Sequence, residues 1–374
     1  MRYIINVYMN RGEKIMKTNR VYNVLKEMEK QGLNQMIVSS PPAIFYLTGK
    51  WFSPGERMVA LYLNTNGNHK LIVNKLFPVY EDLGVDLIWY TDIEDPIQLL
   101  CTIVDKESAL AVDKNWPAHF LIKLMNNNGA KAFVNGSPII DRLRMIKDAE
   151  EIALMKKSSE INDKVMLELW DNLKEGKTEK YYASLLAELY ENHGVNEFSF
   201  SPIVAVSPNG ADPHHHSDKT PIKKGHSIVI DIGGVYNSYC SDMTRTIFFG
   251  EEPSERHAEI YNIVKEANLS AIRKVKEGVK FSEIDKAARD YIENAGYGEY
   301  FTHRTGHSIG IEDHDFGDVS STNNEEVKAG MIFSIEPGIY LKDDIGVRIE
   351  DLVLVTKDGC EVLNSVTKDI TIIK

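Results

Sequence analysis

Five residues in the C-terminal part of this 374-residue chain have side chains that bind divalent cations: Asp231, Asp242, His307, Glu336 and Glu350. Four carboxylates and one imidazole offer hard oxygen donors with a single nitrogen. Such a set suits Mn, Co or Zn in a reactive centre better than a structural zinc ion, which favours thiolates. The negative charges also balance two dications and leave room for a bridging hydroxide. This inventory predicts a hydrolytic centre with two metal ions.

The first two carboxylates are predicted to lie on one β-hairpin. Residues 227–249 contain two apolar runs on either side of Tyr236 and Asn237, which we expect to form the turn. With that turn, Asp231 lies directly opposite Asp242. The two side chains then share a face of the hairpin and are close enough to share an ion.

The two glutamates are predicted to pair in a second hairpin, over residues 332–355. A turn centred on Asp343 makes Glu336 and Glu350 cross-strand neighbours. Arg348 precedes Glu350 by two residues, so both side chains point to the same face of the strand. The second hairpin therefore predicts a carboxylate pair with an arginine beside it.

His307 lies between the two hairpins, with glycines on both sides that permit close approach of the backbone to a site. Taken singly, each of these five residues is most often a solvated or structural group. However, Asp231 follows the apolar run Ile-Val-Ile, and Glu336 follows Ile-Phe-Ser-Ile. An unpaired carboxylate beside such a run is costly to bury, which favours a cation partner.

Five segments of the chain resemble the pita-bread metallopeptidases, a superfamily that holds methionine aminopeptidase, aminopeptidase P, prolidase and the metal-free creatinase. The resemblance is strong from about residue 140 to the end and covers the first 140 residues only in general architecture. The last two segments look most like the proline-specific branch, aminopeptidase P and prolidase. The segments are Asp231-Ile-Gly, Ser241-Asp242-Met-Thr-Arg-Thr, Gly306-His307-Ser-Ile-Gly, Ser334-Ile-Glu336-Pro-Gly-Ile-Tyr340 and Val347-Arg-Ile-Glu350-Asp.

This resemblance implies hydrolysis of the peptide bond between an N-terminal residue and proline, by hydroxide activated between two divalent ions. Manganese is the first expectation, with Co or Zn as alternatives. Asp231 is expected to hold one ion, and His307 and Glu336 the other, with Asp242 and Glu350 bridging. The resemblance further implies that Glu336 takes the proton of the attacking water and passes it to the leaving nitrogen.

Other site residues are also implied by the resemblance. His214 and His314 match histidines that bind the substrate and stabilise the tetrahedral intermediate. From their spacing alone, Arg348 and Tyr340, four residues or fewer from a predicted ligand, are expected to assist proton movement. His303, four residues before His307, is expected to support the site rather than bind metal. One position departs from the pattern, because Asp318 stands where some prolidases have an arginine that binds the dipeptide carboxylate. We therefore expect tripeptides to compete at least equally with dipeptides.

Two other classes of protein remain open. One is a creatinase-like hydrolase of a non-peptide C–N bond, and the other is a non-catalytic binding module with the same fold. Both should have lost metal ligands, whereas all five are present here. Metal content therefore distinguishes the peptidase from either alternative.

The elements that must position these residues fall into two predicted domains. Residues 16–142 alternate helical and strand patterns, which indicates an N-terminal α/β domain. Asp148 and Glu151 have the spacing of a capping box that begins a long helix. We expect a catalytic domain over residues 143–374 and an N-terminal extension over residues 1–15.

The C-terminal region contains an internal repeat in the order of its predicted elements, which we call the echo. Lys174-Glu-Gly176 and Lys276-Glu-Gly278 each follow a long helical segment, and 18 residues later each is followed by a closing glycine, Gly194 or Gly296. Two related halves of this kind would place a site between them. The echo matches the α+β pita-bread domain with pseudo-twofold internal symmetry that the resemblance implies.

Composition adds bounds on partners. A net charge of −12 and a pI near 5.5 give no electrostatic reason to expect nucleic acid or an anionic membrane. No apolar run approaches the roughly 20 residues of a membrane span. Three distant cysteines form no disulfide framework, which suits the cytoplasm. The resemblance favours a homodimer in which the N-terminal domain of one subunit closes over the site of the other.

Overall fold

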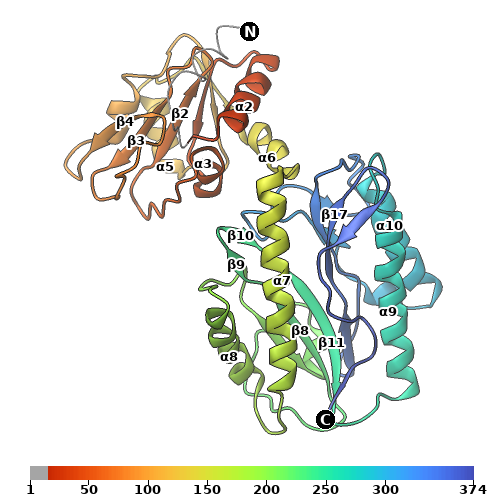
Figure 1. Cartoon of the computed structure of the whole chain (residues 1–374). Helices are drawn as coiled ribbons and strands as arrows, with labels where there is room; N and C mark the ends of the chain where they lie inside the picture. The colour runs from red at the N-terminus through yellow and green to blue at the C-terminus, as the bar shows by residue number, and fades with distance from the viewer. Residues whose placement is uncertain (1–15) are drawn as a thin grey trace. The chain divides into compact units, whose positions relative to one another are not determined.

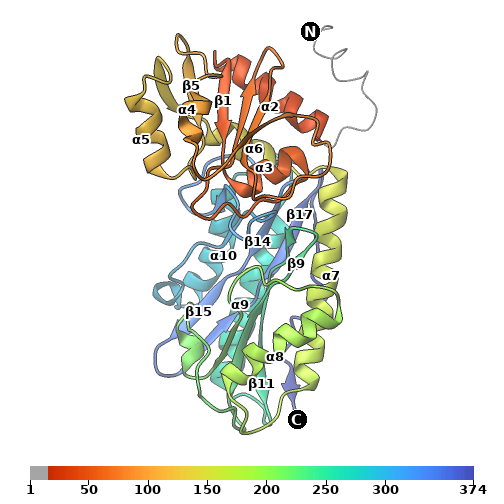
Figure 2. The same cartoon turned by 90° about the vertical axis from the view of Figure 1, so that its left-hand side faces the viewer.

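The computed structural model describes residues 16–374, so the extension predicted for residues 1–15 lies outside the described residues. The chain divides into a compact unit that ends at Arg144 and a second unit, Met145–Lys374 (Figure 1, Figure 2). Within residues 16–374, no helix combines the length and the apolar character that crossing a bilayer requires.

The N-terminal unit is an α/β domain, as the alternating pattern predicted. Its mixed sheet has the strand order β4-β3-β2-β1-β5-β6. The strands are β1 (Gln35–Val38), β2 (Ala60–Asn64), β3 (Lys70–Asn74), β4 (Asp86–Tyr90), β5 (Ala109–Val112) and β6 (Ala132–Asn135). The helices are α2 (Thr18–Lys30), α3 (Pro41–Thr48), α4 (Pro96–Leu100), α5 (Ala118–Asn126) and α6 (Ser137–Met145).

The C-terminal unit holds two helix pairs and a set of antiparallel strands. The long helix α7 begins as predicted, because the Asp148 carboxylate accepts from the Glu151 amide and the Glu151 side chain returns a hydrogen bond. The helices are α7 (Ala149–Asp171), α8 (Glu179–Asn192), α9 (Glu255–Lys274) and α10 (Phe281–Asn294). The strands that position the site are β7 (Ile203–Val206), β8 (Ser227–Ile232), β11 (Met243–Phe249), β12 (Gly306–His307), β13 (Asp318–Val319), β14 (Ile332–Ile335), β15 (Gly338–Leu341), β16 (Ile345–Arg348) and β17 (Asp351–Val355).

The predicted pseudo-twofold symmetry is visible in the backbone hydrogen bonds. Gly176 N donates to Ile222 O at 2.9 Å, and Gly278 N donates to Val327 O at 2.9 Å. Both glycines have positive φ, 82° and 84°, which explains why the echo ends in glycine. Five residues beyond each acceptor, strands β8 and β14 begin. This correspondence makes Asp231 and Glu336 equivalent positions in the two halves.

Each half has its own apolar core. The first core is formed by α7 and α8 with strands β7, β8 and β11, and includes Met166, Leu186 and Ile230. The second is formed by α9 and α10 with strands that include β14 and β17, and contains Val264 and Phe333. The proposed ligands therefore lie on or beside strands that pack against the apolar faces of a helix pair.

The register of the first hairpin differs from the prediction by two residues. Asn237 and Ser238 form the turn, with φ of 48° and 69°, and Tyr236 pairs with Tyr239 through the short strands β9 (Val235–Tyr236) and β10 (Tyr239–Cys240). Asp231 consequently lies opposite Thr244 rather than Asp242. A shift of two residues keeps every side chain on its face, so Asp242 still points to the side that Thr244 shares.

The second hairpin has the predicted register. Ile335 pairs with Asp351 before the glutamates, and Gly338 pairs with Arg348 after them. The turn residue Asp343 has φ of 60°. Because both flanking ladders share one register, the residue opposite Glu336 is Glu350.

Candidate metal centre

All five predicted metal ligands line one cavity in the C-terminal unit. Its volume is about 480 Å³. The predicted substrate-binding residues His214 and His314 also line it, as does Arg348. The remaining lining residues are Phe200, Ile203, Pro213, His303, Arg304 and Asp313.

The ligand atoms converge around His307. Its Nε2 lies 3.5 Å from Asp242 Oδ2 and 3.5 Å from Glu336 Oε1. One donor atom each from Asp242, His307 and Glu350 lie within 4.8 Å of one another. All three residues are buried, at 2 to 4% exposure. Three anionic or neutral donors at such separations can surround a cation that touches each of them.

Unpartnered oxygens provide a direct test of whether a cation fits. Asp231 Oδ1, Asp242 Oδ1 and Glu350 Oε1 are buried and have no hydrogen-bond partner within the described chain. An unsatisfied buried oxygen costs about 1–3 kcal/mol, and more when it is charged. Divalent ions prefer such carboxylate oxygens combined with an imidazole. The residues present therefore fit divalent metal ions.

The electrostatics of the protein without metal point the same way. Burial, followed by the repulsion of neighbouring carboxylates, raises the pKa of Asp242 and of Glu350 well above its ordinary value. Burial also raises the pKa of Glu336 to about 8. Burial lowers the pKa of His307 to about 3, which keeps its imidazole neutral and able to bind metal. A divalent ion supplies the positive charge that this buried anionic cluster lacks.

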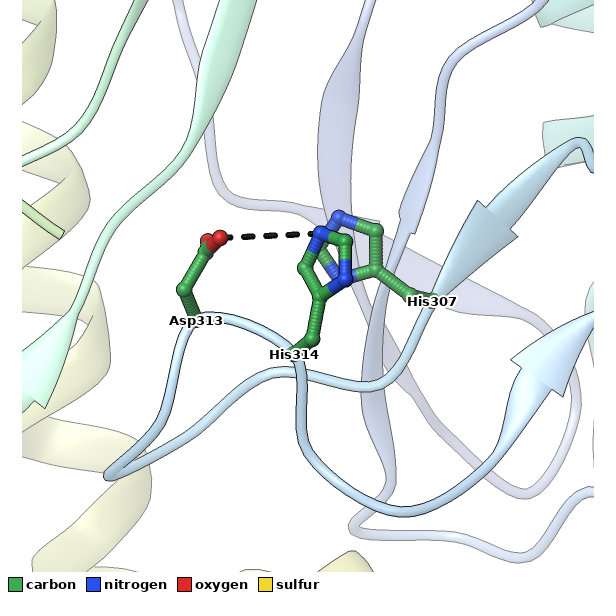
Figure 3. A group of neighbouring side chains, drawn as sticks. All are labelled: His307, Asp313 and His314. Carbon is green, nitrogen blue, oxygen red and sulfur yellow. Dashed lines mark ion pairs between the residues drawn. The ribbon is translucent and has the colours of Figure 1, made fainter. Parts of the chain in front are cut away.

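Figure 3 shows His307 and His314 with their rings close together and the carboxylate of Asp313 directed toward His314. The two ring centroids are 3.9 Å apart, and His314 Nε2 lies 3.5 Å from Asp313 Oδ2. Burial and the charge of Asp231 raise the pKa of Asp313 to about 7. The sequence analysis missed Asp313, and the one signal that could have found it is its position beside His314.

Arg348 and Tyr340 connect the two halves of the site. Arg348 Nη2 donates to Asp231 Oδ2 at 2.6 Å, and Nη1 donates to the Tyr340 hydroxyl at 3.1 Å. The Tyr340 hydroxyl also lies 2.8 Å from His303 Nε2. His303 therefore contacts Tyr340, and Tyr340 is linked to Asp231 through Arg348.

Thr244 joins the same network. Its hydroxyl donates to Glu350 Oε2 at 2.7 Å and accepts from Arg348 Nε at 3.1 Å. The sequence analysis did not identify this residue, because Thr244 was not expected to oppose Asp231. Once the turn is placed at residues 237–238, the hairpin register points to it.

A buried glutamate holds the segment that carries His214. Glu179, the first residue of α8, accepts from Val206 N at 2.8 Å, from Asn209 Nδ2 at 2.9 Å and from Asp218 N at 2.8 Å. The first two donate to Oε1, and Asp218 N donates to Oε2, which also lies 2.7 Å from His215 Nε2. The histidine tract is thus divided, because His214 lines the cavity while His215 anchors the loop.

In the second half, a buried aspartate likewise holds a loop segment against a helix. Asp285 of α10 binds Arg289 with both oxygens at 3.0 Å, and accepts from the Thr305 hydroxyl at 2.7 Å. Arg289 Nη2 also donates to His303 O at 3.0 Å. The segment that leads to His307 is therefore fixed to a helix, a role that no motif in the sequence indicated.

Comparison with known proteins agrees with this geometry. Residues 153–357 match the metallopeptidase family M24, and residues 20–146 match the creatinase/prolidase N-terminal domain. An uncharacterized peptidase of Staphylococcus aureus (strain MW2) is 36% identical over 354 residues, covering 93% of this chain and 99% of that protein.

Solved structures share the whole fold. Recombinant prolidase from Thermococcus sibiricus has a TM-score of 0.89 and 34% identity, covering 96% of this chain and 100% of that one. X-Pro aminopeptidase from Thermotoga maritima MSB8 has a TM-score of 0.83 and 29% identity, covering 93% of this chain and 100% of that one. The fold, the cavity and the family match lead to one conclusion: the chain belongs to metallopeptidase family M24.

Proposed function

We propose that this chain hydrolyses the peptide bond between an N-terminal residue and proline, with two divalent metal ions and manganese as the physiological metal. The observation that carries the proposal is the set of unpartnered, buried carboxylate oxygens around one cavity of an M24 chain. Relatives of the same fold are named prolidase and X-Pro aminopeptidase, which favours proline-containing substrates.

Five side chains would hold the ions. Asp231 would bind one ion, His307 and Glu336 the other, and Asp242 and Glu350 both. When bound, two such ions supply an activated water at neutral pH and a Lewis acid for the scissile carbonyl. The neutral imidazole of His307 and the oxygens that lack partners suit this role.

We assign the proton transfer to Glu336. Its Oε1 accepts from Ser334 Oγ at 3.1 Å and lies 3.5 Å from His307 Nε2. This leaves a carboxylate in the cavity that can take a proton from the attacking water and give it to the leaving nitrogen. Arg348 donates to Asp231 and holds its orientation, and the Tyr340 hydroxyl accepts from Arg348.

His214 and His314 would bind the substrate. Both line the cavity, and neither supplies one of the five ligand atoms. An imidazole N–H directed at the scissile carbonyl stabilises the negative charge that develops on its oxygen. His214 comes from a segment that the buried carboxylate of Glu179 holds, and the ring of His314 lies 3.9 Å from that of His307.

The lack of an N–H in a bond to proline explains why a metal centre suits this substrate. A bond to proline is a tertiary amide with no N–H, so a peptidase that requires that donor cannot recognise it. A site that holds the free amino end and the carbonyl has no such requirement.

The experiment that tests this function compares Ala-Pro with Ala-Ala, each with added Mn and with EDTA. We expect hydrolysis of Ala-Pro that requires Mn and is at least tenfold faster than that of Ala-Ala. Absence of Ala-Pro hydrolysis by the metal-loaded chain would favour the creatinase-like hydrolase or the binding module. Equal rates on both peptides would leave a metallopeptidase without the proline preference.

We also propose that the enzyme is a homodimer of the cytoplasm. Cys101, Cys240 and Cys360 are free thiols, which suits a reducing compartment. Size-exclusion chromatography with light scattering measures the oligomeric state, and a mass of twice 42.4 kDa is expected.

A further inference from the structure

We propose that Arg304 binds the free α-carboxylate of the substrate, so that the site selects dipeptides over longer peptides. This inference rests on the proposed function, because it concerns the proline side of the same scissile bond. It also replaces the expectation, drawn from Asp318, that tripeptides compete at least equally.

Arg304 has N–H groups that are available to a substrate, whereas the N–H groups of Arg348, the other arginine of the cavity, are bound to protein groups. Arg348 is buried and donates to Asp231, Tyr340 and Thr244. Arg304 is half-buried, and within residues 16–374 its guanidinium makes one hydrogen bond, from Nη2 to His314 Nδ1 at 3.0 Å. Its remaining N–H groups have no protein acceptor there. Arginine is the residue that binds a carboxylate with two parallel hydrogen bonds.

The backbone on both sides of Arg304 is fixed. Arg289 holds the carbonyl of His303, and Asp285 accepts from the Thr305 amide at 3.3 Å and from its hydroxyl at 2.7 Å. His303 Nδ1 lies 2.7 Å from the Arg304 carbonyl. The point from which the Arg304 side chain extends is therefore set before substrate binds, which favours a specificity role.

The Arg304 guanidinium also lies close to the proposed metal ligands. Arg304 contacts His314, the His314 ring lies 3.9 Å from that of His307, and His307 lies 3.5 Å from Glu336. In an Xaa-Pro dipeptide the α-carboxylate carbon is two bonds from the nitrogen that leaves. We therefore expect the Arg304 guanidinium to lie beside the substrate carboxylate when the scissile bond lies at the proposed metal ligands.

The repulsion expected from Asp318 does not arise in this structure. Asp318 pairs with His307 in the β12–β13 ladder, and it is not among the described residues that line the cavity. Its Oδ1 accepts from Asn323 Nδ2 at 3.4 Å. Arg304 is left as the charged side chain with free donors on the substrate side.

The test uses the metal-loaded enzyme, the variant Arg304→Met and two substrates that differ in one charge, Ala-Pro and Ala-Pro amide. We expect Arg304→Met to lower kcat/KM for Ala-Pro by about 100-fold, mainly through KM. Hydrolysis of the amide should change less than about threefold, because it has no carboxylate to lose. Arg304→Lys should recover part of the activity on Ala-Pro, since it keeps the charge without the planar fork.

Two controls separate binding from folding. Arg256 forms a surface ion pair with Asp344 at 2.7 Å, so Arg256→Met should leave both rates unchanged. Inhibition by free proline should weaken in Arg304→Met, while metal content and Tm stay at the wild-type values. Prolinamide should inhibit both proteins equally.

Several outcomes would overturn the inference. Equal losses on Ala-Pro and its amide would make Arg304 a structural or general positioning residue. Equal hydrolysis of both substrates by the wild type, or faster hydrolysis of Ala-Pro-Ala than of Ala-Pro, would leave the proposed function intact and remove the carboxylate selection. A wild-type enzyme that cleaves none of these peptides would overturn both proposals together.

Discussion

The two halves of the C-terminal unit share a scaffold but differ in the chemistry that it carries. Asp231 on β8 and Glu336 after β14 occupy equivalent positions, and each follows a buried apolar run. Opposite Asp231 stands Thr244, whereas opposite Glu336 stands Glu350. The two differing residues contact each other, because the Thr244 hydroxyl donates to Glu350 Oε2 at 2.7 Å.

The comparison shows how a symmetric fold yields an asymmetric centre. The first half supplies two carboxylates, Asp231 and Asp242, and the Thr244 hydroxyl, which donates to Glu350 of the other half. The other half supplies two carboxylates and His307. Each half also fixes its loop to a helix through a buried acid, Glu179 in one and Asp285 in the other. Scaffold and anchors are repeated, while the residues that face the cavity are not.

The largest effect is expected from Glu350→Ala, which removes the carboxylate at the position that Thr244 occupies in the first half. Loss of this proposed shared ligand should abolish stable metal binding and lower activity by at least about 1,000-fold. Elemental analysis after dialysis and an Ala-Pro assay measure both. Glu361→Ala is the matched control, because Glu361 pairs with Lys156 at the surface. Full metal content and full turnover in Glu350→Ala would refute the proposal that Glu350 is a ligand of both metal ions.

Metal removal should expose the repulsion between the halves. Without metal, Glu336 has a pKa of about 8, above the roughly 4.3 of an unfolded glutamate. The folded state therefore binds more protons between these values, and stability is lost as pH rises through that window. We expect EDTA to lower Tm by roughly 10 °C near neutral pH, and by less at pH 5.

Scanning calorimetry of the loaded and EDTA-treated protein from pH 5 to pH 8 measures this difference directly. Taking the difference at each pH removes the titration of groups far from the site. If the difference in Tm between the loaded and the EDTA-treated protein became smaller as pH rises, the proposed repulsion within the buried anionic cluster would be contradicted.

His314→Ala removes a proposed substrate-binding group of the second half and leaves the five proposed metal ligands in place. We expect normal folding and metal content, with turnover lower by about 100-fold, the usual effect of losing one donor to the transition state. Loss of metal instead would mean that His314 and His307 have been given each other's roles. His214→Ala, the corresponding change in the first half, should show the same pattern.

The smallest effect is expected at Thr244, where the halves differ most simply. Thr244→Val removes the hydroxyl that orients Glu350 and should lower kcat by about tenfold, the size expected for one hydrogen bond to a charged group. Thr244→Ser keeps the hydroxyl and should remain within about twofold. If valine and serine variants are equally active, the cross-half hydrogen bond has no part in the reaction.

Much of the fold and of the site could be predicted because it depends on local chemistry. The capping box at Asp148, the paired glycines Gly176 and Gly278 and the turn at Asp343 each act within a few residues. Spacing alone therefore located the long helix, the repeat and the pairing of Glu336 with Glu350.

The remaining features depend on choices that the sequence leaves open. Both Asn237 and Ser238 adopt positive φ, and serine has no marked preference for that conformation, so the register of the first hairpin was wrong by two residues. The anchors Glu179 and Asp285 lie on helices far from the residues that they bind. Long-range contacts of this kind leave no periodic or turn signal in the chain.

The most direct test of the account is the location of the metal ions in crystals grown with Mn and measured near its absorption edge. The account predicts two anomalous peaks about 3.5–4 Å apart, bounded by Asp231, Asp242, His307, Glu336 and Glu350. Glu179, His215 and Asp218 also bring ligand atoms within 4.8 Å of one another, but both Glu179 oxygens already accept hydrogen bonds. A single peak at that second cluster, or no peak between the two halves, would contradict the central claim.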